Sequence, residues 1–221
     1  VFFDINNGTI TILNNNVPSL VVSETMMNIA LGGGETETFT AEVMNDGQEG
    51  SVVSFVTYPG QELMRDESFS DGSLPEGWST ATNAECDNPG WYVTEDASSS
   101  YFTIPPGDGF YIATNDDACG SSSDGSNDML YTNEISLPDG MVELSFQRYF
   151  TAGYNQTFHV YVSLNSWETY DEVLNLGYWE GSEEWVKETI DLQAYAGESV
   201  ALAFHSNDNG NWASGVALDD I

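Results

Sequence analysis

The segment Val142-Glu-Leu-Ser-Phe-Gln-Arg-Tyr-Phe150 alternates apolar and polar side chains along most of its length. Successive side chains of a β-strand point to opposite faces of the sheet, so this alternation predicts an antiparallel strand with one buried and one solvated face. A helix would instead repeat its apolar positions every three or four residues. The segment therefore favours an all-β fold.

Short candidate strands continue on both sides of this segment, between turn signals rich in Gly, Asn, Asp and Pro. From residue 66 onward they are Glu67–Ser70, Trp91–Val93, Tyr101–Ile104, Phe110–Thr114, Asp128–Ile135, Val142–Phe150, Thr157–Ser163, Asp171–Leu176, Val186–Asp191, Ser199–Ser206 and Gly215–Ile221. One helical turn is expected at Leu192–Ala196, closed by Gly197. This succession predicts two packed antiparallel sheets in a jelly-roll β-sandwich.

The sequence before residue 63 has a different pattern, and we divide the chain into N-terminal strands with a linker (1–17), a short β segment (18–62) and the jelly roll (63–221). Candidate strands in the first two parts are Val1–Ile5, Thr9–Leu13, Ser19–Ser23, Met27–Leu31, Thr36–Val43 and Ser51–Tyr58. The run L-G-G-G-E-T-E-T-F-T-A-E-V-M-N-D-G at 31–47 resembles the leading half of the immunoglobulin-like modules of bacterial surface proteins. This resemblance implies a partial immunoglobulin-like segment that docks on a neighbour.

The charge balance is strongly acidic, with 36 Asp and Glu residues against 3 Lys and Arg residues and a formal net charge of -33. Binding to nucleic acid or to anionic lipid needs basic side chains to neutralise phosphate, so both classes of partner are excluded. No apolar run is long enough to span a membrane, and no signal peptide is expected at the N-terminus. Two interpretations of the acidity remain open: solubility in salty water, and cation binding by some of the carboxylates.

The two cysteines, Cys86 and Cys119, form an even count in an acidic, Gly- and Ser-rich chain. This pattern favours a secreted protein with one disulfide, which would stabilise the fold by roughly 3–4 kcal/mol on the chain-entropy model. The alternative is a pair of buried free thiols.

Five ordered motifs carry a family resemblance. They are E-S-F-S-D-G-S-L-P-E-G-W at 67–78, N-D-D-A-C-G-S-S-S-D-G-S-N-D-M-L-Y-T-N-E-I-S-L-P at 115–138, V-Y-V-S-L-N-S-W at 160–167, W-V-K-E-T-I-D-L-Q-A-Y-A-G-E-S-V-A-L-A-F at 185–204 and V-A-L-D-D-I at 216–221. In this order they resemble the cleaved-adhesin, or choice-of-anchor J, jelly-roll domains, which are similar to MAM domains. The resemblance covers residues 66–221.

The resemblance implies a non-catalytic adhesion or structural module of a secreted or cell-surface multidomain bacterial protein, with structural Ca²⁺. One segment departs from the family, because the usual Ser/Thr-x-Asp-Gly-Gly before the Trp is shortened at Leu164–Trp167. Relatives also extend their last strand beyond Asp-Asp-Ile, which leads us to expect that Val1–Ile5 of a neighbouring copy completes it. The module would then be one unit of a tandem repeat or an assembly.

A calcium site is predicted where the first and last strands of the jelly roll meet. Asp219 and Asp220 follow an apolar strand in a chain with few basic partners, and Ca²⁺ prefers six to eight oxygen ligands. The predicted ligands are Glu67, Asp116, Asp117, Asp128, Asp219 and Asp220. The alternatives are a proton-sharing carboxylate pair and a solvated strand end.

Aromatic residues between 167 and 185 form the other candidate site. Trp167, Tyr170, Tyr178 and Trp179 are predicted to bind a ligand by stacking against sugar rings, unless they only cover sheet edges. Trp78, Trp91 and Trp185 are expected in the core.

Enzyme motifs are weak. His159 and His205 lie in predicted strands, which favours packed or surface residues over a catalytic base, and no G-x-S-x-G nucleophile turn occurs. We therefore predict a non-catalytic adhesion module that binds protein or glycan on a target surface. A carbohydrate-binding module attached to a secreted hydrolase is the alternative, and a hydrolase using two carboxylates is a third possibility.

Overall fold

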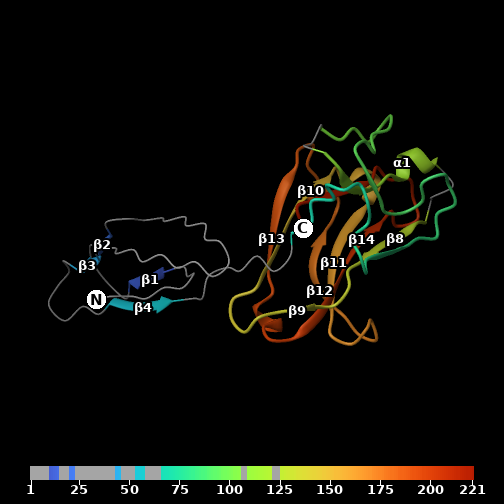
Figure 1. Cartoon of the computed structure of the whole chain (residues 1–221). Coiled ribbons are helices and arrows are strands. Elements are labelled where there is room, and N and C mark those ends of the chain that lie inside the picture. Colours follow the sequence, from blue (N-terminus) through green and yellow to red (C-terminus); the bar gives the residue numbers. More distant parts are fainter. Residues whose placement is uncertain are drawn as a thin grey trace. The chain divides into compact units, whose positions relative to one another are not determined.

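The computed structural model describes residues 10–14, 20–22, 43–45, 53–57, 66–105, 109–120 and 125–221. The chain divides into two compact units, Val1–Glu62 and Leu63–Ile221 (Figure 1). In the first unit β1 (Ile10–Asn14) pairs with β4 (Val53–Thr57), and β2 (Leu20–Val22) pairs with β3 (Val43–Asn45), both antiparallel. The predicted strands Val1–Ile5 and Met27–Leu31 lie outside the described residues, as does most of the immunoglobulin-like run.

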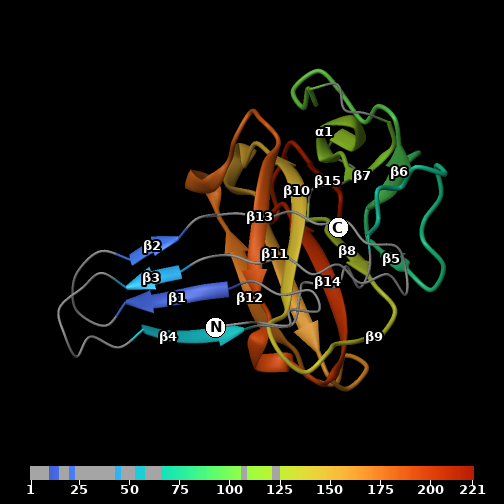
Figure 2. The ribbon, with the colours of Figure 1, turned by 60° about the vertical axis from the view of Figure 1, so that its left-hand side comes forward.

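The second unit is a sandwich of two antiparallel sheets, which confirms the predicted fold (Figure 2). The order in the five-stranded sheet is β13 (Val186–Asp191), β10 (Glu143–Phe150), β15 (Val216–Asp219), β7 (Tyr111–Thr114) and β6 (Tyr92–Thr94). The order in the six-stranded sheet is β12 (Asp171–Leu176), β11 (Thr157–Ser163), β14 (Ser199–Asn207), β8 (Asn127–Tyr131) and β5 (Ser79–Ala81), with β9 (Ile135–Ser136) beside β14.

Two predicted strands are wrong. Glu67–Ser70 turns away after one backbone pair, because Phe69 has a left-handed φ of 53°. Tyr101–Ile104 forms a loop instead, in which Ser98 Oγ accepts the Ile104 backbone N–H. Local side-chain acceptors of this kind compete with the hydrogen bonds of a sheet.

The sequence analysis also missed two short elements. Helix α1 (Asp116–Cys119) begins after Asn115, whose side chain accepts the Ala118 backbone N–H at 2.8 Å. Strand β5 has three exposed residues and no apolar pattern that could reveal it. The described residues of this unit also contain the 3₁₀ turns η2 (Gly153–Asn155), η3 (Tyr178–Glu180) and η4 (Gln193–Tyr195), and η4 lies within the predicted turn at Leu192–Ala196.

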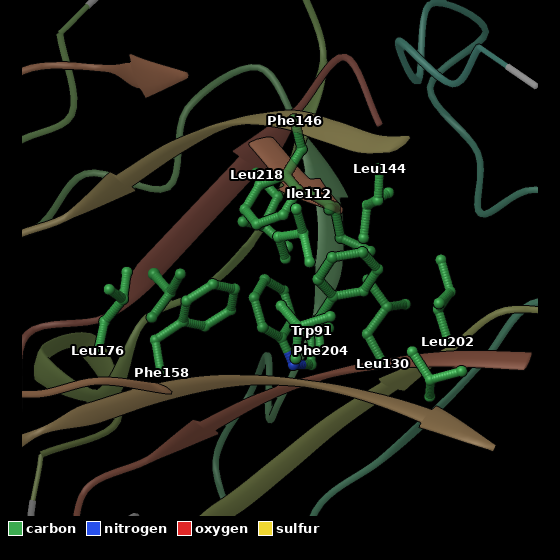
Figure 3. Packing of buried hydrophobic residues seen from close by; sticks show 14 of the residues in the cluster. Trp91, Ile112, Leu130, Leu144, Phe146, Phe158, Leu176, Leu202, Phe204 and Leu218 are labelled. Carbon is green, nitrogen blue, oxygen red and sulfur yellow. The ribbon is translucent and has the colours of Figure 1, made fainter. Parts of the chain in front are cut away.

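The main core lies between the two sheets (Figure 3). Phe146 of β10 contacts Phe158 of β11 and Phe204 of β14, with ring centroids 6.1 and 5.4 Å apart. All three rings are buried, and edge-to-face pairs of this kind add to the stability gained from area burial. Trp78 and Trp91 belong to this core as predicted.

A second apolar cluster covers the outward face of the five-stranded sheet. Residues Ala97, Phe102 and Ile104, from the loop after β6, lie on strand residues of β7, β10 and β15. The strand residues are Tyr111, Ala113, Tyr149 and Ala217, and Tyr92 and Trp185 pack at the margin of the cluster. This part of the five-stranded sheet is therefore buried on both faces.

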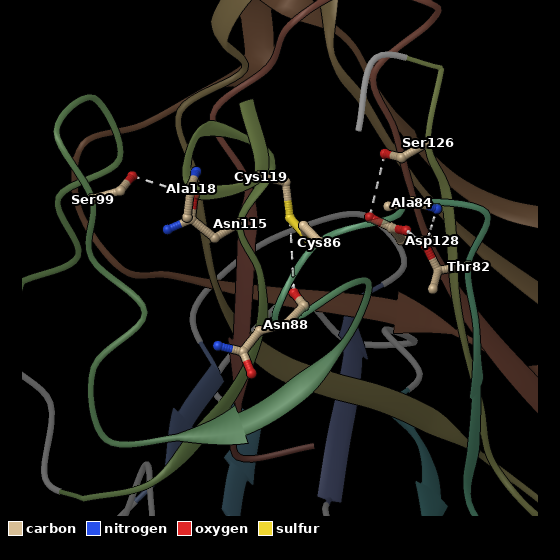
Figure 4. Close-up of a disulfide and its surroundings, with 10 residues drawn as sticks. All are labelled: Thr82, Ala84, Cys86, Asn88, Ser99, Asn115, Ala118, Cys119, Ser126 and Asp128. Atoms are coloured by element: carbon tan, nitrogen blue, oxygen red, sulfur yellow. Dashed lines mark hydrogen bonds between the residues drawn. A yellow bond between two sulfur atoms is a disulfide. The ribbon is translucent and has the colours of Figure 1, made fainter. Parts of the chain in front are cut away.

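A disulfide between Cys86 and Cys119 joins the loop after β5 to the last residue of α1, as predicted (Figure 4). The two cysteines are 33 residues apart in sequence, so the bond closes a large loop of the unfolded chain. No helix in the described parts of the chain is long and apolar enough to cross a membrane.

Candidate functional site

The ends of the jelly roll meet as the sequence predicts. The Glu67 backbone N–H donates to the Ile221 carbonyl at 2.8 Å, and the Ile221 N–H donates to the Glu67 carbonyl at 3.0 Å. Glu67 Oε1 accepts the Phe69 N–H at 3.0 Å, and Asp219 Oδ1 accepts the Asp220 N–H at 2.9 Å. These two carboxylates therefore already bind local backbone donors.

The six predicted calcium ligands do not come together at this junction. Strand β15 starts at Val216, opposite Thr114, which lies immediately before Asn115 and α1. Asp219 lies three residues further along the strand, or about 10 Å away. Asp116 and Asp117 are thus at the opposite end of β15 from Glu67. Among the residues that the structure describes, no group of three or more His, Cys, Asp or Glu side chains is arranged to hold a metal ion.

Asp116, Asp117 and Asp128 instead hold loops in place through hydrogen bonds. Asp117 Oδ2 accepts from Ser99 Oγ at 2.5 Å and from the Tyr101 N–H at 2.9 Å, while Asp116 Oδ2 accepts from the Ala213 N–H at 2.5 Å. In an acidic chain with few cations, backbone and hydroxyl donors take the place of salt-bridge partners. This use of the three carboxylates does not fit the predicted calcium shell.

Asp128 is buried and accepts hydrogen bonds from Thr82 Oγ1 at 2.5 Å and from Ser126 Oγ at 3.4 Å (Figure 4). Burial raises the pKa of Asp128, and the charge of nearby Asp208 raises it further, although the two hydroxyl donors oppose the shift. Asp208 is also buried, and its Oδ2 accepts the N–H groups of Gly125 and Ser126.

The outward face of the six-stranded sheet carries a row of aromatic and imidazole rings. His159 of β11 lies opposite His205 of β14, and their ring centroids are 5.4 Å apart. In the adjacent row Ala203 of β14 lies between Tyr161 of β11 and Tyr131 of β8. We call Tyr131, His159, Tyr161 and His205 the tyrosine–histidine face.

Hydrogen bonds fix the rings of this face. His159 Nδ1 is 2.6 Å from Glu172 Oε1, Tyr161 Oη is 3.3 Å from His205 Nδ1, and His205 Nε2 contacts Asn127 Oδ1. Burial lowers the pKa of His205 to about 4, and the neighbouring His159 lowers it too, while Glu172 acts in the opposite direction. Burial also raises the pKa of Tyr161 to about 12. His205 and Tyr161 are therefore uncharged at neutral pH.

Trp167 and Tyr170, two of the predicted ligand-binding residues, flank this face. The Trp167 ring lies 5.1 Å from Tyr131, and the Tyr170 ring lies 5.0 Å from Tyr161. Ser163 orients this loop because its Oγ accepts the Trp167 N–H at 3.0 Å. The sequence analysis missed Tyr131 and Tyr161, although alternation in D-M-L-Y and V-Y-V-S places both on the face opposite the core.

Tyr178 and Trp179, the other two predicted residues, lie elsewhere. They belong to η3, which follows the last residue of β12, whereas Tyr170 precedes its first. Six strand residues separate the two pairs by about 20 Å. Tyr178 and Trp179 contact each other with ring centroids 4.7 Å apart, and Trp179 is 90% exposed. The four predicted residues therefore form two separate pairs.

A cleft of about 510 Å³ opens among the loops at the end of the sandwich that carries η2 and α1. Its lining residues are Tyr101, Tyr154, Asn211 and Trp212, and we call it the loop-end cleft. The Trp212 ring lies 4.4 Å from Tyr154 and 5.7 Å from Tyr101, measured between centroids. The sequence analysis missed this cleft because three loops far apart in sequence supply its residues, and no local pattern connects them.

Comparison with known proteins agrees with this architecture. The family model described as MAM domain, meprin/A5/mu, matches residues 68–221. The K3 and K1 cleaved adhesin domains of Lys-gingipain from Porphyromonas gingivalis W83 match with TM-scores of 0.53 and 0.51 and identities of 21% and 19%, each over 71% of this chain and 94% of the domain. TmCBM61 in complex with β-1,4-galactotriose matches with a TM-score of 0.47 and 14% identity, over 70% of this chain and 91% of that one. The comparison with curated proteins gave no match.

Proposed function

The chain belongs to the MAM domain family, and from this premise we propose that it is a non-catalytic adhesion module of an extracellular or cell-surface protein, which binds a glycan on its target through the tyrosine–histidine face. The observation that carries the proposal is the row of rings on a sheet face that the second apolar cluster leaves uncovered. The fold shared with adhesin domains supports a binding role over a catalytic one.

The chemistry of this face suits a sugar better than a charged partner. Its rings offer flat apolar surfaces, against which the C–H groups of a pyranose ring can stack. Asn127, Glu172 and Asn175 lie around the rings and are exposed, so they supply hydrogen-bonding groups for hydroxyls. A few polar groups beside an apolar surface are typical of ligand sites, where they fix orientation.

The rigidity of the face supports the same function. Tyr131, His159, Tyr161 and His205 stand on three adjacent strands. Hydrogen bonds hold the rings of His159, Tyr161 and His205, and the Tyr131 ring packs against Trp167. A surface that is already ordered loses little conformational entropy when it binds. The exposed Tyr170, at 61% exposure, would add contact area at its margin.

A glycan array followed by variants tests the proposal. The strongest glycan is titrated into the full chain and into Trp167→Ala and Tyr170→Ala, which remove the two rings that flank this face, and we expect the Kd to rise about tenfold in each. Trp179→Ala is the matched control, because this ring is more exposed and lies beyond the far end of β12. Equal loss in all three variants, or none in the first two, would contradict the proposal.

A further inference from the structure

We propose that the loop-end cleft is a second ligand site, which binds the pyranose ring of a neutral sugar residue. The cleft is built from its own residues and does not depend on the tyrosine–histidine face. Its volume of about 510 Å³ lies within the range of small-molecule sites in proteins.

The first support is the exposure of its aromatic rings. Tyr101 is 74% exposed and Tyr154 is 66% exposed, although both contact Trp212. Their rings make angles of 89° and 77° with the Trp212 ring, so both stand edge to face against it. Three large aromatic side chains around one opening are more than packing at the surface requires, and they offer ring faces to a ligand.

The second support is that side chains of α1 and of the loop after β14 hydrogen-bond to the backbone that carries these rings. Asp117 Oδ2 accepts a hydrogen bond from the Tyr101 N–H, and Asp116 Oδ2 accepts one from the N–H of Ala213, which follows Trp212. On the remaining side Asn209 Nδ2 donates to the Asn155 carbonyl at 2.8 Å, next to Tyr154. Each aromatic residue of the cleft is thus tied through a neighbouring backbone group to a polar side chain from another segment.

The third support is an unusual backbone around Tyr154. Ala152, Tyr154 and Asn155 all have left-handed φ values, of 54°, 54° and 77°. Such conformations are uncommon for residues other than glycine, and they persist where the surrounding structure imposes them. Here the packing is close, because a Cβ added to Gly153 would collide with Ser214 Oγ. The result is a turn that directs the Tyr154 ring into solvent beside Trp212.

Charge defines the class of ligand. The cleft is lined by neutral side chains, and Asp116 and Asp117 lie behind it in a chain whose net charge is -33. An acidic sugar or a phosphate would be repelled by this field. A neutral sugar meets no such penalty, and the Asn211 amide can both donate to and accept from its hydroxyls.

The experiment uses the full chain and defined probes in ligand-observed NMR. The neutral probes are the methyl glycosides of galactose, glucose and mannose, and the charged probes are N-acetylneuraminic acid and choline. We expect at least one neutral glycoside to bind in the millimolar range, with a Kd about tenfold higher in Tyr154→Ala and in Trp212→Ala. Met141→Ala, at an exposed side chain in neither ligand region, is the control and should leave this Kd unchanged within about twofold.

Three outcomes would overturn the inference: no neutral glycoside binds, choline binds in their place, or binding is lost in Tyr170→Ala and retained in Tyr154→Ala. Circular dichroism of each variant confirms that it is folded. Because Trp167→Ala and Tyr170→Ala report on the tyrosine–histidine face alone, failure at one region can be told from failure at the other.

Discussion

The outward faces of the two sheets carry similar residues but differ in what covers them. On the five-stranded sheet Tyr111 and Tyr149 are buried beneath Phe102 and its neighbours from the loop after β6. On the six-stranded sheet Tyr131 and Tyr161 remain partly exposed beside two histidines. An aromatic side chain on an outward face therefore stabilises the fold or meets the solvent according to whether a loop crosses it.

The hydrogen bonds of the tyrosines reflect this difference. Tyr111 Oη accepts the Ala97 N–H at 2.8 Å, and Tyr149 Oη donates to the Thr103 carbonyl at 2.5 Å, so both hydroxyls fasten the covering loop. On the tyrosine–histidine face Tyr161 Oη interacts with His205, which belongs to the same sheet. The first arrangement attaches a loop, whereas the second only orders side chains within one sheet.

The largest effect on stability is expected at the outward face of the five-stranded sheet, which the loop after β6 covers. Phe102→Ala removes a fully buried ring that lies 5.5 Å from Tyr149, so we expect the free energy of unfolding to fall by about 3–5 kcal/mol. Urea unfolding followed by tryptophan fluorescence measures this loss. A loss below about 1 kcal/mol would show that the covering loop contributes little to the sheet beneath it.

The carboxylates at the two ends of β15 allow a second comparison, which concerns the predicted calcium site. If Glu67, Asp219 and Asp220 bind Ca²⁺ with the affinity usual for extracellular modules, 10 mM Ca²⁺ should stabilise the fold by about 1–3 kcal/mol. Thermal unfolding with Ca²⁺ and with EDTA measures this. Asp219→Asn should abolish the difference while Asp117→Asn, at the other end, preserves it. An unchanged Tm with EDTA would mean that Ca²⁺ does not stabilise the fold.

The buried His205 of the tyrosine–histidine face predicts that the free energy of unfolding depends on pH. The unfolded chain binds a proton at this residue below about pH 6.5, whereas burial lowers the folded pKa to about 4, so stability should fall as the pH decreases between these values. After allowance for solvent screening the effect is on the order of 1 kcal/mol. Unfolding free energies of the native chain and of His205→Gln between pH 4 and 7 measure it. Parallel curves for the two proteins would contradict the prediction.

The smallest effect on stability is expected at the margin of the tyrosine–histidine face. Tyr170→Ala removes a ring that is 61% exposed, so the free energy of unfolding should change by no more than about 0.5 kcal/mol. The same urea titration as for Phe102→Ala provides the measurement. A loss comparable to that of Phe102→Ala would mean that the two faces do not differ in function as proposed.

Regular alternation made the central strands predictable. The bounds of β11, β12 and β13 agree with the sequence analysis. Side chains alternate regularly between the core and the outward face in β11, whereas β12 has a register shift opposite Val160 and Tyr161. Tyr101–Ile104 carries the same apolar signal but lies on a sheet without joining it. Burial alone does not distinguish a strand from a covering loop, and this is why the assignment of Tyr101–Ile104 was wrong.

The candidate sites were less predictable than the fold. That Glu67 lies beside the last strand followed from the expected jelly-roll topology, but the positions of Asp116 and Asp117 depend on a four-residue helix with no apolar period. The loop-end cleft combines residues more than fifty positions apart, and only the tertiary structure brings them together. Trp167 and Tyr170 were found because they are near in sequence, but for the same reason they were grouped wrongly with Tyr178 and Trp179.

The seven residues of β11 give the molecule a fixed span. Trp167 and Tyr170 lie beyond Ser163 and Tyr154 of the loop-end cleft lies before Thr157, so about 20 Å of strand separates this aromatic pair from the cleft, with His159 and Tyr161 between them. A monosaccharide that stacks on Trp167 and Tyr170 therefore cannot reach the cleft at the same time. Simultaneous occupation of both ligand regions would instead connect two glycan chains, and the avidity would depend on the number of modules on a surface. The sandwich would then serve as a cross-linking spacer whose length is built into its strands.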